Sequence, residues 1–247
     1  MVLRQKNDYV TLIIYTFRIF FVSIFRMTYP TIYPARHLLT VTLTGLVLAI
    51  ITALTLDQTV SLYFKQPELT WLWLAARNIT NAGLSEHYFI LSLALYTFGK
   101  WVRPQFVQTR IWARNLFFAL ITSGIFIHIV KFCVGRQRPH KTENFDPFVF
   151  HPFNIHWDFQ SFASGHTQVM FTVATMLALA FPRAKWWFFA VAAFFGFTRV
   201  IIHDHFLSDV IGGAIVGYVG TMTGLFWIHL WQNRSSRRSD KATSLST

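Results

Sequence analysis

The stretch ARNLFFALITSGIFIHIVKFCVGRQRP, residues 113–139, decides the fold class of this chain. Residues 113–134 are predominantly apolar, and about 20 such residues are enough for a helix to cross the hydrocarbon layer of a membrane. Lys131, Arg136 and Arg138 lie at the end of this run, and Pro139 prevents a helix from continuing through it. The sequence therefore predicts a membrane helix with a cluster of cations at one end.

Five more apolar stretches share this character, and together they predict an all-α, polytopic bundle of six transmembrane helices. The predicted spans lie at about 37–56, 84–99, 113–134, 165–182, 186–202 and 206–231. Only 13% of the residues are charged, against about 25% in soluble domains, and this deficit also favours a membrane protein. The single cysteine, Cys133, excludes an internal disulfide and a cysteine-based zinc cluster.

The stretch before the first span, residues 9–27, is apolar but contains Arg18 and Arg26. These arginines can share one helix face, which suits a helix that lies in the membrane interface. A signal peptide is the competing interpretation, but no small-residue cleavage site follows. We expect three parts: an N-terminal interfacial segment at 1–36, a six-helix domain at 37–231 and a basic cytoplasmic tail at 232–247, whose polar stretch from Asn233 to Thr247 is expected to be disordered.

The basic residues follow the positive-inside rule. A net charge of +12 is also compatible with a nucleic-acid-binding protein, so the positions of the charges decide between the two classes. With a cytoplasmic N-terminus, 15 of the 22 lysines and arginines fall in cytoplasmic segments, whereas eight of the ten acidic residues fall outside. This asymmetry assigns the basic excess to membrane topology, and we expect no nucleic-acid partner.

A second cluster, Ser164-Gly165-His166, lies at the start of the fourth predicted span. The first backbone N–H groups of a helix have no partner within the helix, so those of Ser164 and Gly165 can bind an anion. Glycine also allows an anion to approach the backbone closely.

A third cluster joins the end of the fifth span to the start of the sixth. Arg199 lies near the end of the fifth span, and His205 and Asp209 lie at the start of the sixth. The last two residues are four apart, hence on one face of a helix. A carboxylate there can hold one imidazole nitrogen as N–H and leave the other free for nucleophilic attack.

The predicted topology places all three clusters at the same, outer membrane face. Three cations, a helix N-terminus and two histidines would then converge in a small volume. Such a set suits phosphoryl chemistry, in which positive groups stabilise the charge on the phosphoryl oxygens.

These clusters resemble the three motifs of the type 2 phosphatidic acid phosphatase superfamily. The matching segments are Lys131 through Pro139, Ser164-Gly165-His166, and Arg199 with His205 and Asp209. The family often has proline where Ala163 stands and serine where Thr198 stands. Neither difference removes a cation or a group that transfers a proton.

The resemblance implies a lipid phosphate phosphatase that needs neither a metal nor a cofactor. It implies that His205 attacks phosphorus to form a phosphohistidine and that Asp209 orients His205. His166 protonates the leaving oxygen and then activates the water that hydrolyses the intermediate. The residues that it implies for phosphate binding are Lys131, Arg138, Ser164, Gly165 and Arg199.

The resemblance also implies a substrate class, and the basic inner loops suit a small bacterial inner-membrane enzyme. The substrate would be a membrane lipid phosphate such as undecaprenyl diphosphate, phosphatidylglycerol phosphate, phosphatidic acid or lipid A 1-phosphate. We expect a bacterial inner-membrane protein with cytoplasmic termini, a site that faces the periplasm, and no obligatory protein partner.

Three alternatives stay open at this point. The first is a phosphotransferase that passes the phosphoryl group to another lipid, and the second is a non-catalytic protein that binds anionic lipids. The third is a metal-dependent hydrolase with ligands from His203, Asp204, His205 and Asp209, although the nearby cations would repel a divalent ion. Arg136 is interpreted as a contact to the substrate headgroup or as a solvated loop charge. The aromatic loop 139–162 is a hypothetical gate for a lipid chain.

Overall fold

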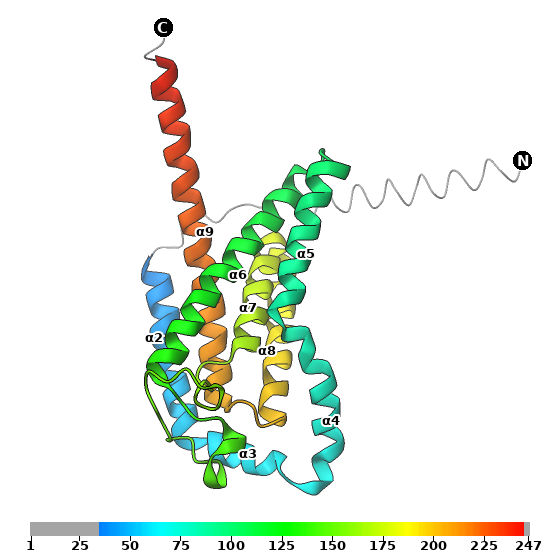
Figure 1. The fold of residues 1–247 in the computed structure, drawn as a ribbon, viewed down its shortest axis with the longest axis vertical. Helices are drawn as coiled ribbons and strands as arrows, with labels where there is room; N and C mark the ends of the chain where they lie inside the picture. Colours follow the sequence, from blue (N-terminus) through cyan, green and yellow to red (C-terminus); the bar gives the residue numbers. More distant parts are fainter. Residues whose placement is uncertain (1–34, 245–247) are drawn as a thin grey trace, which may run out of the picture.

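The computed structural model describes residues 35–244, which form a bundle of helices (Figure 1). The helices are α2 (Ala35–Thr55), α3 (Asp57–Phe64), α4 (Thr70–Ile79), α5 (Ser85–Thr97), α6 (Val107–Val134), α7 (Gly165–Ala180), α8 (Lys185–Ile201) and α9 (Leu207–Ser244). The long helices run along the longest axis, and the short helix α3 lies at the lower end of the view together with the chain that joins α6 to α7. We call this the loop end.

Each of the six predicted spans contains a helix, and the predicted all-α class is confirmed. Within residues 35–244, four segments are long and apolar enough to cross a membrane: Ala35–Thr55, Val107–Val134, Pro182–Ile201 and Leu207–Arg234. The helices in the other two predicted spans are shorter, with 13 residues in α5 and 16 in α7. The count of six transmembrane helices therefore stays a prediction.

The predictions for the two ends of the chain, an interfacial helix and a disordered tail, have different outcomes. The interfacial helix predicted within residues 9–27 lies outside the described residues. The prediction of a disordered tail is wrong for most of its length, because α9 continues to Ser244. Residues 233–244 contain neither glycine nor proline, and adding residues to an existing helix avoids the unfavourable nucleation step.

Helix α7 is the central helix, and it packs against α6, α8 and α9. Its buried face also carries polar side chains that join it to α6. The Gln168 side-chain amide donates a hydrogen bond to Ser123 Oγ at 2.6 Å, and the Thr172 hydroxyl donates to the same oxygen at 2.9 Å. Hydrogen bonds between apolar helices add to the packing that holds such a bundle together.

Helix α9 packs closely on α6 and α7 because it has glycines at the contact points. A Cβ atom at Gly213 would lie 2.4 Å from the carbonyl oxygen of Ser164, and one at Gly217 would lie 2.4 Å from that of Gln168. A Cβ atom at Gly220 would lie 2.6 Å from a backbone atom of α6. The glycine spacing in the sequence is typical of close helix packing, and the structure confirms that role.

The end of α6 directs the chain across the loop end. Gly135 has a φ of 59°, a left-handed conformation that ends the helix, and its N–H donates to the Lys131 carbonyl at 2.9 Å. A Cβ atom at Gly135 would lie 1.9 Å from the carbonyl oxygen of His151. Glycine is therefore required both for the turn and for the close approach of the following loop.

We expect Gly217→Ala to destabilise the protein by about 1–3 kcal/mol, because the added methyl group would meet the backbone of α7. Thermal unfolding in detergent measures the effect. Gly124→Ala is the matched control, since a Cβ atom there meets nothing within 4 Å. Alanine also favours a helix more than glycine does, so the control should keep or raise the Tm. Equal falls in Tm for both variants would contradict the packing argument.

Candidate active site

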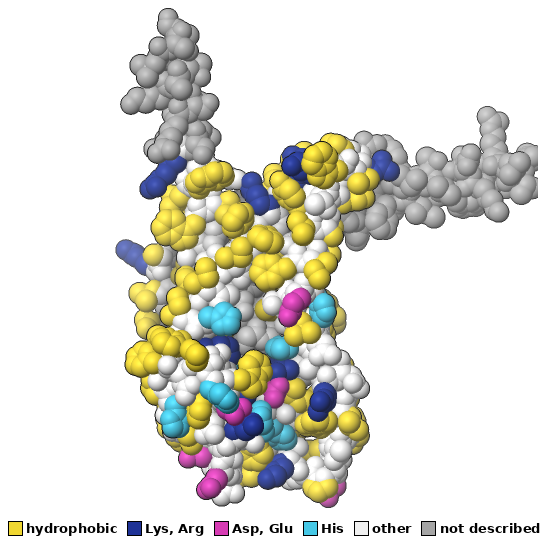
Figure 2. Space-filling model, viewed as in Figure 1, with side chains coloured by type: hydrophobic (Ala, Val, Ile, Leu, Met, Phe, Trp, Pro, Cys, Tyr) yellow, Lys and Arg dark blue, Asp and Glu magenta, His cyan; other side chains and the backbone are white. Residues whose placement is uncertain are grey.

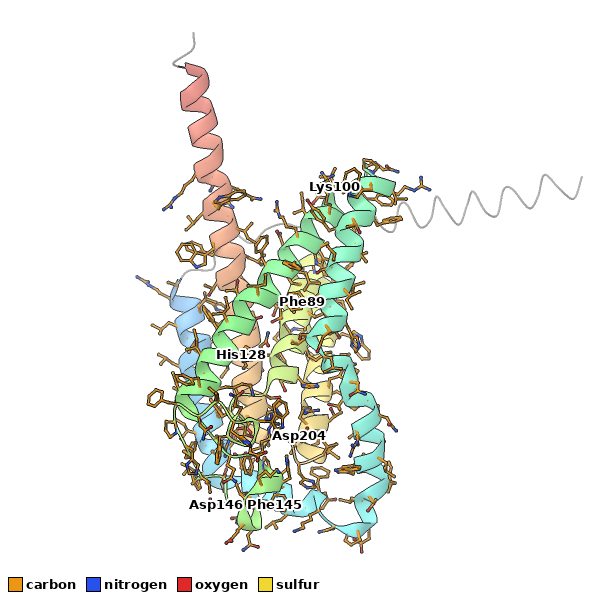
Figure 3. The ribbon with its side chains drawn as sticks, viewed as in Figure 1. Phe89, Lys100, His128, Phe145, Asp146 and Asp204 are labelled. Carbon is orange, nitrogen blue, oxygen red and sulfur yellow. The ribbon has the colours of Figure 1, made fainter. Side chains whose placement is uncertain are left out.

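The three sequence clusters meet at the loop end of the bundle. Lys131 lies in the last turn of α6, Arg199 in the last turn of α8 and Asp209 in the first turn of α9. Figure 2 shows that acidic and histidine side chains gather in the lower half of the molecule, whereas hydrophobic side chains cover much of the upper half. In Figure 3, Asp204 lies at the loop end and Lys100 at the opposite end.

A cavity of about 640 Å³ joins the predicted site residues to an apolar surface. Its polar wall includes Lys131, Arg138, Gly165, His166, Arg199 and His205. Much of the remaining wall comes from α5 and α6, including Phe89, Leu120, Ile121 and Ile125. Figure 3 shows Phe89 on α5 and His128, another lining residue, on α6. A cavity with a cationic end and an apolar wall suits an anion that carries an apolar chain.

Lys131 and Arg138 are buried, and backbone carbonyl groups hold them. Lys131 Nζ donates to the Gln160 carbonyl at 2.5 Å. Arg138 donates from Nε to the Trp157 carbonyl and from Nη1 to the Asp204 carbonyl, both at 3.1 Å. Within the described part of the chain, no carboxylate lies within ion-pair distance of either cation. Neutral carbonyls orient the two cations without cancelling their charge.

The Arg138 guanidinium also lies over the indole ring of Trp157, with its central carbon 3.8 Å from the ring centroid. Burial lowers the pKa of Arg138 to about 10. The side chain therefore remains protonated at neutral pH and can bind a phosphate through its planar fork of N–H donors.

Arg199 is the third cation of the cavity, and it has an acidic partner. Its guanidinium donates from Nη1 to the Thr80 hydroxyl at 3.0 Å and pairs through Nη2 with the Asp204 carboxylate. Its buried Nε makes no hydrogen bond to any described residue. An anion that enters the cavity would therefore compete with Asp204 for this arginine.

His205 is buried between the cavity and Asp209. Its Nδ1 lies 3.6 Å from Asp209 Oδ2, slightly beyond hydrogen-bond distance. The carboxylate therefore favours a proton on Nδ1, which leaves Nε2 as the nitrogen with a free lone pair. Burial holds the pKa of His205 well below its usual value of 6.5. The ring is therefore neutral, as a nucleophile must be.

Asp209 is completely buried, and other hydrogen bonds hold its carboxylate. Oδ1 accepts from Arg136 Nη1 at 2.6 Å, and Oδ2 accepts from the Ser161 hydroxyl at 2.5 Å and from the Phe206 N–H at 2.8 Å. The last contact is one half of a capping box at the start of α9, because the side chain of the third helical residue accepts from the N–H of the residue before the helix.

The second sequence cluster forms the start of α7, as predicted. Gly165 and His166 line the cavity. Ser164 is fully buried and caps the helix, with its hydroxyl oxygen accepting a hydrogen bond from the Thr167 hydroxyl at 3.0 Å. Its N–H donates to the Asp209 carbonyl at 2.9 Å. The structure therefore brings Gly165 and His166 to the cavity and places Ser164 behind them.

The structure overturns both sequence interpretations of Arg136. Its side chain is only 2% exposed and forms ion pairs with Asp57 at 2.8 Å and with Asp209 at 2.6 Å. It is neither a headgroup contact nor a solvated loop charge. The sequence analysis also missed Asp57, an acidic residue directly after the first apolar span, and Ser161. Their partners lie 79 and 48 positions away along the chain, so no local pattern indicated the contacts.

Comparison with known protein families agrees with this geometry. Residues 112–236 match the PAP2 superfamily. The chain belongs to this superfamily. Among the described residues, four helices are long and apolar enough to span a membrane, which further indicates a multi-pass membrane protein.

Among the proteins similar to this chain are two curated relatives and one solved structure. "Lipid A 1-phosphatase" of Rhizobium johnstonii is 39% identical over 102 residues, which cover 41% of this chain and 42% of that protein. The protein of the same name from Rhizobium etli is 36% identical over 113 residues, which cover 45% and 49%. The chain therefore spans less than half the length of these curated relatives.

The solved structure is that of the first transmembrane PAP2 type phosphatidylglycerolphosphate phosphatase from Bacillus subtilis. It is 21% identical to this chain, with a TM-score of 0.53, and covers 78% of this chain and 96% of that one. This likeness shows a common fold.

We expect Arg138→Met to weaken the binding of orthovanadate, a phosphate analogue, by about ten- to one-hundred-fold. The change removes a charge-assisted hydrogen-bonding group worth about 1.5–3 kcal/mol but keeps an apolar stem over Trp157. The stabilisation of the protein by vanadate during thermal unfolding measures the affinity. Arg77→Met is the matched control, because Arg77 also lies over an indole ring, 4.9 Å from that of Trp73, but outside the cavity. Equal losses in the two variants would contradict the assignment.

Proposed function

We propose that this PAP2 protein is a membrane lipid phosphatase that hydrolyses a lipid phosphomonoester or diphosphate through a phosphohistidine intermediate. The observation that carries the proposal is the shared cavity. Three cations and two histidines line its polar end, and apolar side chains of α5 and α6 line much of the rest. The phosphate of a lipid would bind among the cations while its apolar chain lies against the two helices.

In the first step, Nε2 of His205 attacks phosphorus, and the bond between phosphorus and the lipid oxygen breaks. Lys131, Arg138 and Arg199 stabilise the charge on the phosphoryl oxygens during the transfer. His166 donates a proton to the leaving lipid oxygen. The imidazole of His205 becomes positively charged in the intermediate, and the carboxylate of Asp209 beside Nδ1 stabilises that charge.

In the second step, His166 has lost its proton and can act as a base. It takes a proton from a water molecule, and the resulting hydroxide attacks phosphorus. The bond to His205 breaks, inorganic phosphate leaves, and both histidines return to their starting states. The two steps use only side chains of this chain, together with water.

The curated relatives favour lipid A 1-phosphate as the substrate, because both are named for that activity. Undecaprenyl diphosphate, phosphatidylglycerol phosphate and phosphatidic acid are the other candidates, since the cationic end of the cavity recognises a phosphoryl group rather than a particular headgroup.

We further propose that the protein lies in a bacterial inner membrane with the loop end toward the periplasm. The opposite end carries basic residues on several helices and turns: Lys100, Arg103, Arg110, Arg114, Arg183, Lys185 and Arg234. An excess of lysine and arginine is typical of cytoplasmic segments. Accessibility of a cysteine introduced at the exposed Glu143 of the loop end (Glu143→Cys in a Cys133→Ser background) to a membrane-impermeant thiol reagent would report this orientation.

We expect the purified protein in detergent to release phosphate from at least one of the four candidate lipids, and His205→Ala to abolish the release. The lost group is the nucleophile, so the expected fall in rate is at least about a thousandfold, as for the nucleophiles of other covalent enzymes. Excess EDTA should leave the wild-type rate unchanged. His87→Ala is the matched control, because His87 is exposed on α5 and lies outside the cavity.

The outcomes of this assay separate the alternatives. Phosphate release that persists in His205→Ala would show that His205 is not the nucleophile. Phosphate release that EDTA stops would indicate metal-dependent chemistry. Phosphorylation of an added lipid with little free phosphate would indicate a phosphotransferase. Absence of any turnover would favour a lipid-binding protein.

We expect the rate of phosphate release to persist when the pH falls from 7.5 to 5.5. A histidine with the ordinary pKa of about 6.5 would be about 90% protonated at pH 5.5, and a protonated ring cannot attack. Because burial lowers the pKa of His205, its lone pair stays available to a lower pH. The pH dependence of kcat/KM measures this. A loss of activity with a midpoint at pH 6.5 or above would contradict the expectation.

A further inference from the structure

The most heavily buried ionic group at the loop end is a chain of three charged side chains. Asp57, Arg136 and Asp209 are 0%, 2% and 0% exposed. Arg136 lies between the two carboxylates, with Nη2 2.8 Å from Asp57 Oδ2 and Nη1 2.6 Å from Asp209 Oδ1. Its Nε donates to the Pro147 carbonyl at 2.9 Å, so all three guanidinium nitrogens have partners.

Ser208 closes the network between α3 and α9. Its N–H donates to Asp57 Oδ1 at 2.9 Å, and its hydroxyl donates to Asp57 Oδ2 at 2.5 Å. The same hydroxyl accepts a hydrogen bond from Arg136 Nη1 at 2.7 Å. Asp57 therefore holds the residue next to Asp209 and, through Arg136, Asp209 itself.

The charges of this network do not cancel. Two carboxylates and one guanidinium leave one negative charge, and Asp209, the member nearest to His205, lies 3.6 Å from that ring. Without Asp57, the pair of Arg136 and Asp209 would be neutral. A neutral pair stabilises a positive charge on His205 much less than a negatively charged network does, above all where water is excluded.

We propose that Asp57 is a positioning residue for the phosphatase reaction, which keeps a negative charge and a defined carboxylate geometry behind His205 by acting through Arg136 and Asp209. The inference rests on the proposed function, since it concerns the positive charge that His205 gains when it bonds to phosphorus. Asp57 lies outside residues 112–236, the part of the chain that matches the PAP2 superfamily. Helix α3 therefore supplies part of the machinery from a segment that precedes the family match.

The first test compares Asp57→Asn with the wild type for kcat, KM and inhibition by orthovanadate and by inorganic phosphate. We expect kcat to fall about ten- to one-hundred-fold, the range seen when a residue that orients a functional side chain is lost. On the proposed mechanism vanadate bonds to His205 as phosphorus does and makes the ring positive, so its inhibition constant should rise in parallel. KM and inhibition by phosphate should change little, because the cavity cations bind the unreacted phosphate.

The conservative variant and a surface variant complete this comparison. Asp57→Glu keeps the charge and should recover part of the lost kcat. Glu68→Gln removes an exposed carboxylate from the short turn Pro67–Leu69, between α3 and α4. This variant should behave as the wild type. An unchanged kcat in Asp57→Asn would overturn the proposal. A parallel loss of kcat, phosphate inhibition and thermal stability would also overturn it, because it would show a purely structural role.

A double substitution separates charge from structure even if Asp57→Asn alone folds poorly. Asp57→Asn combined with Arg136→Gln removes one negative and one positive charge, so Asp209 again leaves one net negative charge behind His205. We expect this variant to recover much of the kcat and of the vanadate inhibition that Asp57→Asn loses. A double variant that is as slow as the single one, or slower, would overturn the charge argument.

The proposed function and this inference fail in different ways. If the wild type released no phosphate from any lipid, the proposed function would fail, whatever the variants did. Vanadate binding to the wild type and to Asp57→Asn, followed by thermal unfolding, would still test the link between Asp57 and His205. If the wild type were active and Asp57→Asn equally active, only the inference would fail.

Discussion

The site depends on one buried carboxylate, that of Asp209. Its two oxygens accept hydrogen bonds from Arg136, Ser161 and the Phe206 N–H, and its backbone carbonyl accepts from the Ser164 N–H. These partners come from the segment after α6, the segment before α7 and the start of α9. A buried carboxylate is stable only when such donors replace water. Satisfying this single group therefore fixes the relative positions of the segments that carry the candidate catalytic residues.

The opposite constraint governs the cations of the cavity. Lys131 and Arg138 are also buried, yet they are held by neutral backbone carbonyls. A charge that is oriented but not neutralised interacts strongly with an anion that enters a low-dielectric cavity. The site thus divides its charges between two sides of His205. A negative network lies behind the ring at Nδ1, and positive groups line the cavity in front of it.

This division explains how the bundle serves the proposed chemistry. The glycines of α9 bring that helix against α7, which places His205 and Asp209 beside the start of α7, where His166 lies. The left-handed turn at Gly135 directs Arg136 and Arg138 back over the loop end. Helix α3 then covers the buried network through Asp57. Close helix packing, a sharp turn and a buried ion pair thus combine to hold a neutral histidine between opposite charges.

The sequence by itself determined the helical class, the helices within the predicted spans and the convergence of the three motifs. A long apolar run in a membrane must form a helix, because only then are its backbone N–H and C=O groups hydrogen-bonded within the segment. Charged residues at the ends of such runs are costly there and therefore indicate functional sites. For the same reason, Lys131, His166, Arg199 and His205 could be predicted, and all four line one cavity. The polar composition of the tail predicted disorder, whereas a tail without glycine or proline can extend α9 because the helix before it is already formed.

Only the tertiary structure decided the surroundings of those motifs. It buried Arg136, joined it to Asp57, and assigned Asp204 to Arg199 and Ser161 to Asp209. The sequence around Arg136 is that of a loop, which predicts a solvated side chain. Its two carboxylate partners, Asp57 and Asp209, lie 79 and 73 positions away along the chain, so only the fold brings them to it. Periodicity and motif spacing report on neighbours along one helix. Which charges pair across helices depends on how the helices pack and on which groups lose their water, and these are properties of the folded bundle.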